Sequence, residues 1–285
     1  MEFLFIPVGV MVGTLSGFFG IGGGIIVIPV LLLAGFNSAF TAATSLMFVL
    51  GTSLSGAFAH AKMKNVVWQY ALVIGGAGIV FAQISNRIQI HIAGRYDWLL
   101  TLWYLMILGY FAWVLFREEN RRQEKKLKKN PYLAAGLIGS VAGFLSALLG
   151  IGGGFIIPPL LISWAGFEAR KAIGTSLASV IFISLGGSIG YALQLELNYL
   201  LGLCLIIGAF IGAPFGAKMT TKYENKEIKQ RLGKLYIVAI TAMSIDLLAA
   251  FTVHALQWLS LLVLVSFMVY MLFDFYRRLR AVAEK

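Results

Sequence analysis

A glycine cluster that occurs twice constrains this chain more than any other feature. Residues 13–24 read GTLSGFFGIGGG and residues 143–154 read GFLSALLGIGGG, so eight of twelve positions are identical at an offset of 130. The match extends to Pro29 and Pro159. Each cluster interrupts an apolar stretch, and glycine-interrupted apolar segments at matching positions of two halves are typical of a transporter's binding site.

The composition places the chain in a membrane. Of its 285 residues, 59% are hydrophobic and only 12% are charged, whereas about 25% are charged in ordinary soluble domains. Many of its apolar runs approach the roughly 20 residues that a spanning helix requires. These runs are continuous rather than alternating, which favours helices over the strands of a membrane barrel. We therefore predict an all-α, polytopic integral membrane protein.

A basic stretch divides the chain into two repeats. Residues 117–130 carry seven basic and three acidic residues, and such a loop is expected on the cytoplasmic side. The predicted organisation is a first transmembrane repeat over 1–116, a linker over 117–131, and a second repeat over 132–285 with an extra C-terminal helix. The same rule accounts for the net charge of +11, so we expect no nucleic-acid partner.

Counting crossings from the cytoplasmic linker gives a topology. The apolar segment 155–165 would measure about 16 Å as a helix, against a hydrocarbon core of about 30 Å. Each glycine-broken segment is therefore predicted to form a re-entrant or half-helix hairpin, with about seven crossings besides. This makes the halves inverted in a cell (inner or plasma) membrane, with the N-terminus outside and the C-terminus cytoplasmic. Whether the first broken segment spans stays open.

The glycine breaks are the candidate binding site. A helix that begins after a glycine break presents free N–H groups and the positive end of its dipole, which together favour an anion. Hydroxyl groups in the first turns of the following segments either cap the helix or donate to that anion. Close helix packing is the alternative role for the glycines. The candidate residues are Gly20, Gly22, Gly23, Gly24, Thr44, Ser45, Gly150, Gly152, Gly153, Gly154, Thr175 and Ser176.

Ionisable residues inside apolar segments are few. His60 and Asp246 are candidates for coupling transport to protons, because ionisable groups within membrane segments are often functional. The single cysteine, Cys204, cannot form a disulfide or a thiolate metal cluster within the chain. No enzyme motif or nucleotide-binding loop is present, so we expect neither an enzyme nor a metal or other cofactor.

The duplicated glycine cluster, the repeated Thr-Ser-Leu and the sequence HAKMKNVVW at residues 60–68 resemble the TauE/SafE family of sulfite exporters. The resemblance covers nearly the whole chain. It implies a bacterial or archaeal inner-membrane transporter that exports small sulfur-containing anions, such as sulfite or sulfoacetate, driven by an ion gradient. The glycine breaks and Thr-Ser pairs would hold the anion. Tyr191 stands where the first half has His60, so a histidine role is not duplicated.

The resemblance does not decide among sulfite, sulfoacetate, thiosulfate, sulfate and organic sulfonates, nor does it give the direction of transport or the coupling ion. The oligomeric state is also open, with a homodimer among the alternatives. A non-transporting membrane scaffold that docks partners through the basic loop at 117–130 is the alternative function.

Overall fold

The computed structural model describes residues 5–92, 97–117, 131–193, 199–251 and 256–283. Every regular element within these ranges is helical, which confirms the predicted all-α class. The linker over 118–130 lies outside the described residues, as do both ends of the chain. The helices are α1 (Phe5–Phe19), α2 (Gly24–Leu33), α3 (Ser38–Lys62), α4 (Trp68–Ile92), α5 (Asp97–Arg117), α6 (Pro131–Leu149), α7 (Ile157–Ala165), α8 (Ala169–Ala192), α9 (Tyr199–Met219), the short 3-10 helix η3 (Thr220–Lys222), α10 (Asn225–Phe251) and α11 (Leu256–Ala283).

Seven of these helices are long and apolar enough to cross a membrane, namely α3, α4, α6, α8, α9, α10 and α11. The number agrees with the prediction, but the membership differs. Helix α6 qualifies with its 19 residues, whereas α5 contributes only the shorter apolar stretch Thr101–Val114. Helices α2 and α7 have 10 and 9 residues, about 15 Å at 1.5 Å per residue, and are too short to cross.

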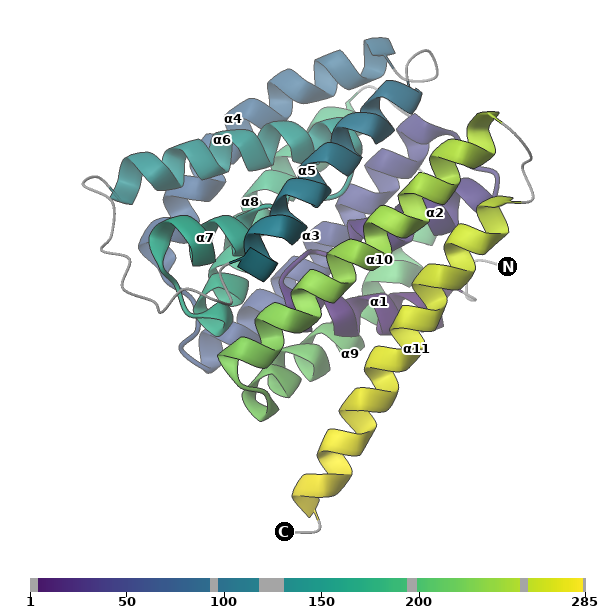
Figure 1. Cartoon of the computed structure of the whole chain (residues 1–285). Helices are drawn as coiled ribbons and strands as arrows, with labels where there is room; N and C mark the ends of the chain where they lie inside the picture. Colours follow the sequence, from purple (N-terminus) through teal and green to yellow (C-terminus); the bar gives the residue numbers. More distant parts are fainter. Residues whose placement is uncertain (1–4, 93–96, 118–130, 194–198, 252–255, 284–285) are drawn as a thin grey trace.

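The two halves exchange their first helices. Helix α1 packs along α9 of the second half, and α6 packs along α4 of the first half; α4 and α6 run side by side at one edge of the bundle (Figure 1). Glycines line both seams. A Cβ atom on Gly216 would lie 1.8 Å from the carbonyl oxygen of Thr14, and one on Gly143 would lie 2.1 Å from that of Gly78. The helix backbones therefore touch, as small residues allow in membrane proteins.

Helices α3 and α8 pair in a way that is repeated when the halves are exchanged. Gly187 packs against Leu46 near one end of the pair, and Gly56 packs against Leu177 near the other, so the two helices are antiparallel. Leu46 and Leu177 are equivalent positions of the repeats, and so are Gly56 and Gly187. A two-fold axis perpendicular to α3 and α8 produces this pattern. The arrangement supports the inverted orientation, which remains a prediction for the bilayer.

The outside of the bundle is apolar over most of its helices. Large hydrophobic side chains on α3, α5, α9 and α11 are more than half exposed, among them Phe58, Trp103, Ile211 and Leu262. A soluble protein does not expose so many of them, whereas lipid tails accept them. Helix α11 runs along the edge of the bundle and projects beyond it at its C-terminal end (Figure 1).

Candidate functional site

Each glycine break is a stretch of left-handed backbone. We call residues 20–24 the first break and residues 150–154 the second break. Residues with a Cβ atom are strained at the positive φ angles found here, whereas glycine adopts these angles without strain. In chain order the φ angles are 74°, 76° and 85° at Gly20, Gly22 and Gly23, and 69°, 88° and 68° at Gly150, Gly152 and Gly153. Backbone conformation thus requires glycine at the same three positions of both repeats.

The two breaks cross each other in direct contact. A Cβ atom on Gly24 would lie 2.6 Å from the carbonyl oxygen of Ile151, and one on Gly154 would lie 2.6 Å from the carbonyl carbon of Ile21. Side chains do not fit at such distances, so the main chains themselves meet. Helix α2 begins at Gly24 and α7 begins three residues after Gly154. The N-terminus of α2 therefore lies at the crossing, whereas the N-terminus of α7 lies three residues beyond it.

Val49 of α3 fills the space beside the crossing. A Cβ atom on Gly22 would lie 2.7 Å from its Cγ1 atom, and one on Gly152 would lie 2.2 Å from it. One turn later, the Thr52 hydroxyl donates to the carbonyl oxygen of Gly22 at 2.6 Å. This side chain holds the first break against α3.

The Thr-Ser pairs of the two repeats lie in different environments. Ser176 donates to the carbonyl oxygen of Gly20 at 2.9 Å, and the Thr175 hydroxyl accepts from the backbone N–H of Val67 at 3.0 Å. Thr44 and Ser45 are just as buried, yet their hydroxyl oxygens have no hydrogen-bond partner among the described residues. The hydroxyls of Thr175 and Ser176 are therefore hydrogen-bonded within the protein, whereas those of Thr44 and Ser45 are available to a ligand or to water.

Two further serines belong to the site and were not among the predicted residues. Ser16 and Ser146 are equivalent in the two repeats, fully buried, and without a side-chain hydrogen bond within the described part of the chain. A Cβ atom on Gly153 would lie 3.2 Å from that of Ser146. Their identity in the two glycine clusters is the sequence signal that could have identified them.

His60 and Tyr191 occupy equivalent positions and make equivalent contacts. The Nε2 atom of His60 lies 3.0 Å from the carbonyl oxygen of Gly17, and the Tyr191 hydroxyl donates to that of Ala147 at 2.9 Å. Because a carbonyl only accepts, Nε2 of His60 carries the proton. Its Nδ1 atom lies 3.3 Å from the amide nitrogen of Asn65. Each side chain therefore ties the end of a hairpin's first helix to its neighbour.

Asp246 is not brought to the breaks. It lies on α10 and accepts a hydrogen bond from Ser260 of α11, and α10 packs mainly on α5 and α11. The two residues predicted for proton coupling have different partners, because His60 contacts Gly17 of α1 and Asp246 contacts Ser260 of α11. No group of three or more metal-binding side chains occurs within the described ranges.

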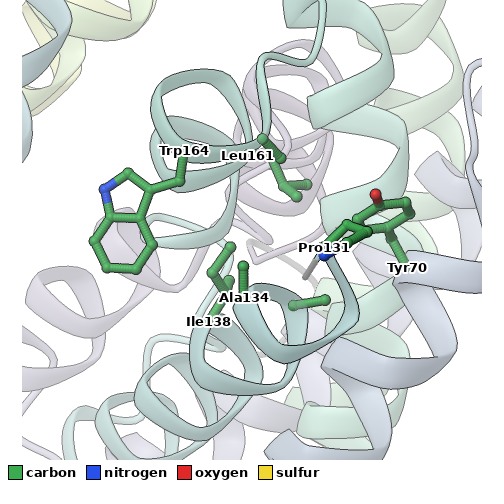
Figure 2. Close-up of a pocket in the computed structure, with 8 residues that line it drawn as sticks. Tyr70, Pro131, Ala134, Ile138, Leu161 and Trp164 are labelled. Carbon is green, nitrogen blue, oxygen red and sulfur yellow. The ribbon is translucent and has the colours of Figure 1, made fainter. Parts of the chain in front are cut away.

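One pocket on the bundle lies between α4, α6 and α7 and is nearly apolar (Figure 2). A pocket of this composition offers an anion no positive charge and few hydrogen-bond donors, so we do not assign the anion site to it. Its lining residues are Tyr70, Pro131, Ala134, Ala135, Ile138, Leu161, Trp164 and Ala165.

Comparison with known proteins places this arrangement in a family. The model of the family described as "Sulfite exporter TauE/SafE" matches residues 5–247, which include both breaks and the helices that pack on them. The chain belongs to the TauE/SafE family. The match supports a membrane transporter rather than an enzyme.

Curated relatives of this TauE/SafE member carry transporter names. It is 28% identical over 247 residues to a "Probable membrane transporter protein" of Methanocaldococcus jannaschii, covering 81% of this chain and 91% of the relative. It is 31% identical over 231 residues to the "Probable membrane transporter protein YdhB" of Bacillus subtilis, covering 80% and 94%. No solved structure gives a significant match. The chain is thus a multi-pass membrane transporter protein.

Proposed function

We propose that this transporter moves small sulfur-containing anions, such as sulfite, sulfoacetate or a related organosulfonate, out of the cell across its inner or plasma membrane. The family description names sulfite export, and this is the support for the substrate class and for the direction. The N-terminus would face outward and the C-terminus the cytoplasm, as the distribution of basic residues predicts.

The crossing of the two glycine breaks is the observation that carries the proposal. Helix α2 begins at the crossing, and the first N–H groups of a helix have no partner within it. Helix α7 begins three residues beyond the crossing and offers fewer donors, because Pro158 and Pro159 in its first turn have no N–H. Both helix dipoles place partial positive charge on this side of the crossing. An oxyanion bound there would accept backbone hydrogen bonds from both repeats, and it would need no lysine or arginine side chain.

Buried hydroxyl groups supply further donors for this anion. Ser16, Thr44, Ser45 and Ser146 are buried with no partner for their oxygens in the described structure. A hydroxyl can rotate to donate to a bound anion or to a water molecule. Leaving such groups unpaired in a membrane protein costs free energy, and a polar ligand or water removes this cost.

Transport would proceed by rocking of the two inverted repeats about the crossing. Because α1 packs on α9 and α6 packs on α4, the first helix of each repeat would move with the other repeat. An ion gradient would drive the cycle. His60 and Asp246 are the side chains that would carry protons if the driving ion is a proton.

Sulfite flux in proteoliposomes that contain only this protein tests the proposal. We expect flux that depends on an imposed ion gradient and that other sulfur-containing anions inhibit in competition. Protein that is folded by circular dichroism but moves no sulfite or other sulfur anion would contradict the proposal. That result would favour the scaffold that docks partners through its basic loop.

A further inference from the structure

Three buried polar side chains on α4 form a cluster that the proposed anion site does not use. Ser85, Asn86 and Gln89 are 0%, 1% and 4% exposed, and we call them the α4 oxygen cluster. Their Oγ, Oδ1 and Oε1 atoms have no hydrogen-bond partner among the described residues. The spacing places them on one face of the helix, whereas the neighbouring Arg87 is exposed.

The hydrogen bond of Asn86 fixes what its free atom can bind. Its Nδ2 atom donates to the carbonyl oxygen of Gly187 at 3.0 Å. Because a carbonyl oxygen cannot donate, the amide cannot be reversed without losing this bond. The free Oδ1 atom is therefore an acceptor only, and an anion cannot satisfy it. A cation or a hydrogen-bond donor is required.

The α4 oxygen cluster lies beside the C-terminal end of α6. Gly139 packs on Ile74 and Gly143 packs on Gly78, so α4 and α6 are parallel with a constant difference of 65 in residue number. This register places the last residue of α6, Leu149, level with residue 84 of α4, directly before Ser85. The last carbonyls of a helix lack intrahelical partners and carry partial negative charge. In α6 the carbonyl oxygens of Ser146 and Ala147 accept from the Ile151 N–H and the Tyr191 hydroxyl, so the carbonyl oxygens of Leu148 and Leu149 are the ones that a ligand would use.

Neutral oxygens at the end of a broken helix suit one chemical class of ligand. Hard cations prefer oxygen ligands, and transporters use the carbonyl ends of half-helices for their coupling cations. A divalent ion would require carboxylates to offset its desolvation, and the described residues hold no acidic cluster of that kind. The charge of a monovalent ion is much less costly to desolvate.

We propose that the α4 oxygen cluster and the C-terminal end of α6 bind an alkali-metal cation, and that this cation drives the cycle. The second part of this inference rests on the proposed transport function, whereas the first part does not. The second break starts where α6 ends, and it leads toward α7 and the proposed anion site. Cation and anion would therefore bind at opposite ends of one short glycine segment and attract each other.

The equivalent place in the other repeat lacks this chemistry. Gly216, Ala217 and Thr220 of the second half correspond to Ser85, Asn86 and Gln89. The Thr220 hydroxyl already donates to the carbonyl oxygen of Ala217 at 2.6 Å. The chain would therefore hold a single cation of this type, although its anion site is built from both repeats.

Sodium binding to the purified full-length protein tests the cation site without any transport. We expect sodium chloride to raise the melting temperature above that in N-methyl-D-glucamine chloride of equal ionic strength, because a ligand of the folded state stabilises it. Radioactive sodium should bind at one saturable site. Ser85→Ala combined with Gln89→Leu should weaken this binding on the order of tenfold or more.

Gln83→Leu is the matched control variant. Gln83 lies on the same helix and donates to the carbonyl oxygen of Gly186 at 2.5 Å, but its side chain is exposed and lies outside the cluster. It should lose stability without losing the response to sodium. Absence of a sodium-specific shift in the wild type, or an equal shift in the double variant, would overturn the cation site and leave water as the occupant.

Flux measurements separate this inference from the proposed function. Sulfite flux that an imposed sodium gradient accelerates, and that the double variant makes insensitive to sodium, would support the coupling. Sulfite flux that is indifferent to sodium would overturn the coupling and leave anion transport intact. Sodium binding in a protein that moves no sulfur anion would support the site and overturn the transport proposal.

Discussion

The first and second breaks have the same backbone and different surroundings. Both have left-handed glycines at three equivalent positions, and both touch the other break through an equivalent glycine and isoleucine. At the first break, the nearby hydroxyls of Thr175 and Ser176 are hydrogen-bonded within the protein. The equivalent Thr44 and Ser45 of the other repeat are bonded to no described residue.

The comparison indicates which features both copies of a duplicated segment must retain. A left-handed turn in contact with a second main chain is open only to glycine, so both copies retain it. Side chains around the turn are less restricted. Where they are bonded they stabilise the fold, and where they are unpaired they are available to a ligand or water. The symmetric backbone and the asymmetric side chains are therefore suited to separate tasks.

Alanine substitutions at the crossing should reduce sulfite flux and melting temperature more than any other change, and the reduction should be equal in the two repeats. In Gly24→Ala and Gly154→Ala the new methyl group would overlap backbone of Ile151 and Ile21, and overpacking of this kind costs about 1–3 kcal/mol or more. We expect both variants to lose sulfite flux to background in proteoliposomes and to melt at lower temperature.

Gly76→Ala and Gly136→Ala are the controls for this comparison. Nothing lies within 4 Å of a Cβ atom at either position, and alanine is the better helix former. These variants should keep both flux and melting temperature. Flux at the control level in either crossing variant would show that the two breaks are not in the contact described here.

The hydroxyl groups of Ser45 and Ser176 should respond in opposite ways to removal. Ser176→Ala loses its bond to Gly20 and should lower the free energy of unfolding by about 1 kcal/mol. Ser45→Ala loses no bond to a described residue, so its stability should be unchanged or higher. Its KM for sulfite flux should rise about tenfold if the hydroxyl donates to the anion, a loss of one hydrogen bond to a charged group.

Thermal unfolding and concentration-dependent flux, measured on the same preparations, distinguish the two effects. A loss of stability in Ser45→Ala equal to that in Ser176→Ala would mean that Ser45 is bonded within the protein after all. The difference between the two repeats would then disappear at this position.

The sequence predicted the helices and the breaks because these depend on local properties. Apolar run length predicted the number of long apolar helices, and the paired glycine clusters located the two breaks, but run length did not distinguish α6, which is long enough to span, from α5, of which only Thr101–Val114 is apolar. The sequence did not reveal that α1 packs on α9 and α6 on α4, because glycine spacing alone does not name the partner helix. Gly208, Gly212 and Gly216 of α9 lie against the backbone of α1 in the structure, a contact that their spacing in the sequence does not assign to any particular helix.

The individual roles of site residues were less predictable. Thr44 and Thr175 are threonines at equivalent positions, but only the Thr175 hydroxyl accepts a hydrogen bond from the described residues, namely from Val67, and this contact depends on tertiary packing. The α4 oxygen cluster is hidden for a similar reason, because serine, asparagine and glutamine near the end of a span look like interfacial residues. Their burial against α8 and beside the end of α6 distinguishes them.

The smallest effects on stability are expected at His60 and Tyr191, and comparing these two residues tests whether His60 couples transport to protons. Each donates to the carbonyl oxygen of an equivalent residue, Gly17 or Ala147, so Tyr191→Phe and His60→Leu should each cost about 1 kcal/mol of stability. His60→Gln keeps a donor and should recover most of that loss. Because tyrosine serves the same contact without titrating near neutral pH, we expect His60→Gln to leave the pH dependence of sulfite flux unchanged.

A flattened pH dependence in His60→Gln, at wild-type stability, would contradict this expectation. It would assign proton coupling to His60 and make the two repeats functionally unequal at this position. With pH dependence retained, the equal contacts of His60 and Tyr191 are sufficient to explain both residues. The driving ion would then be sought at the α4 oxygen cluster, which has no counterpart in the other repeat.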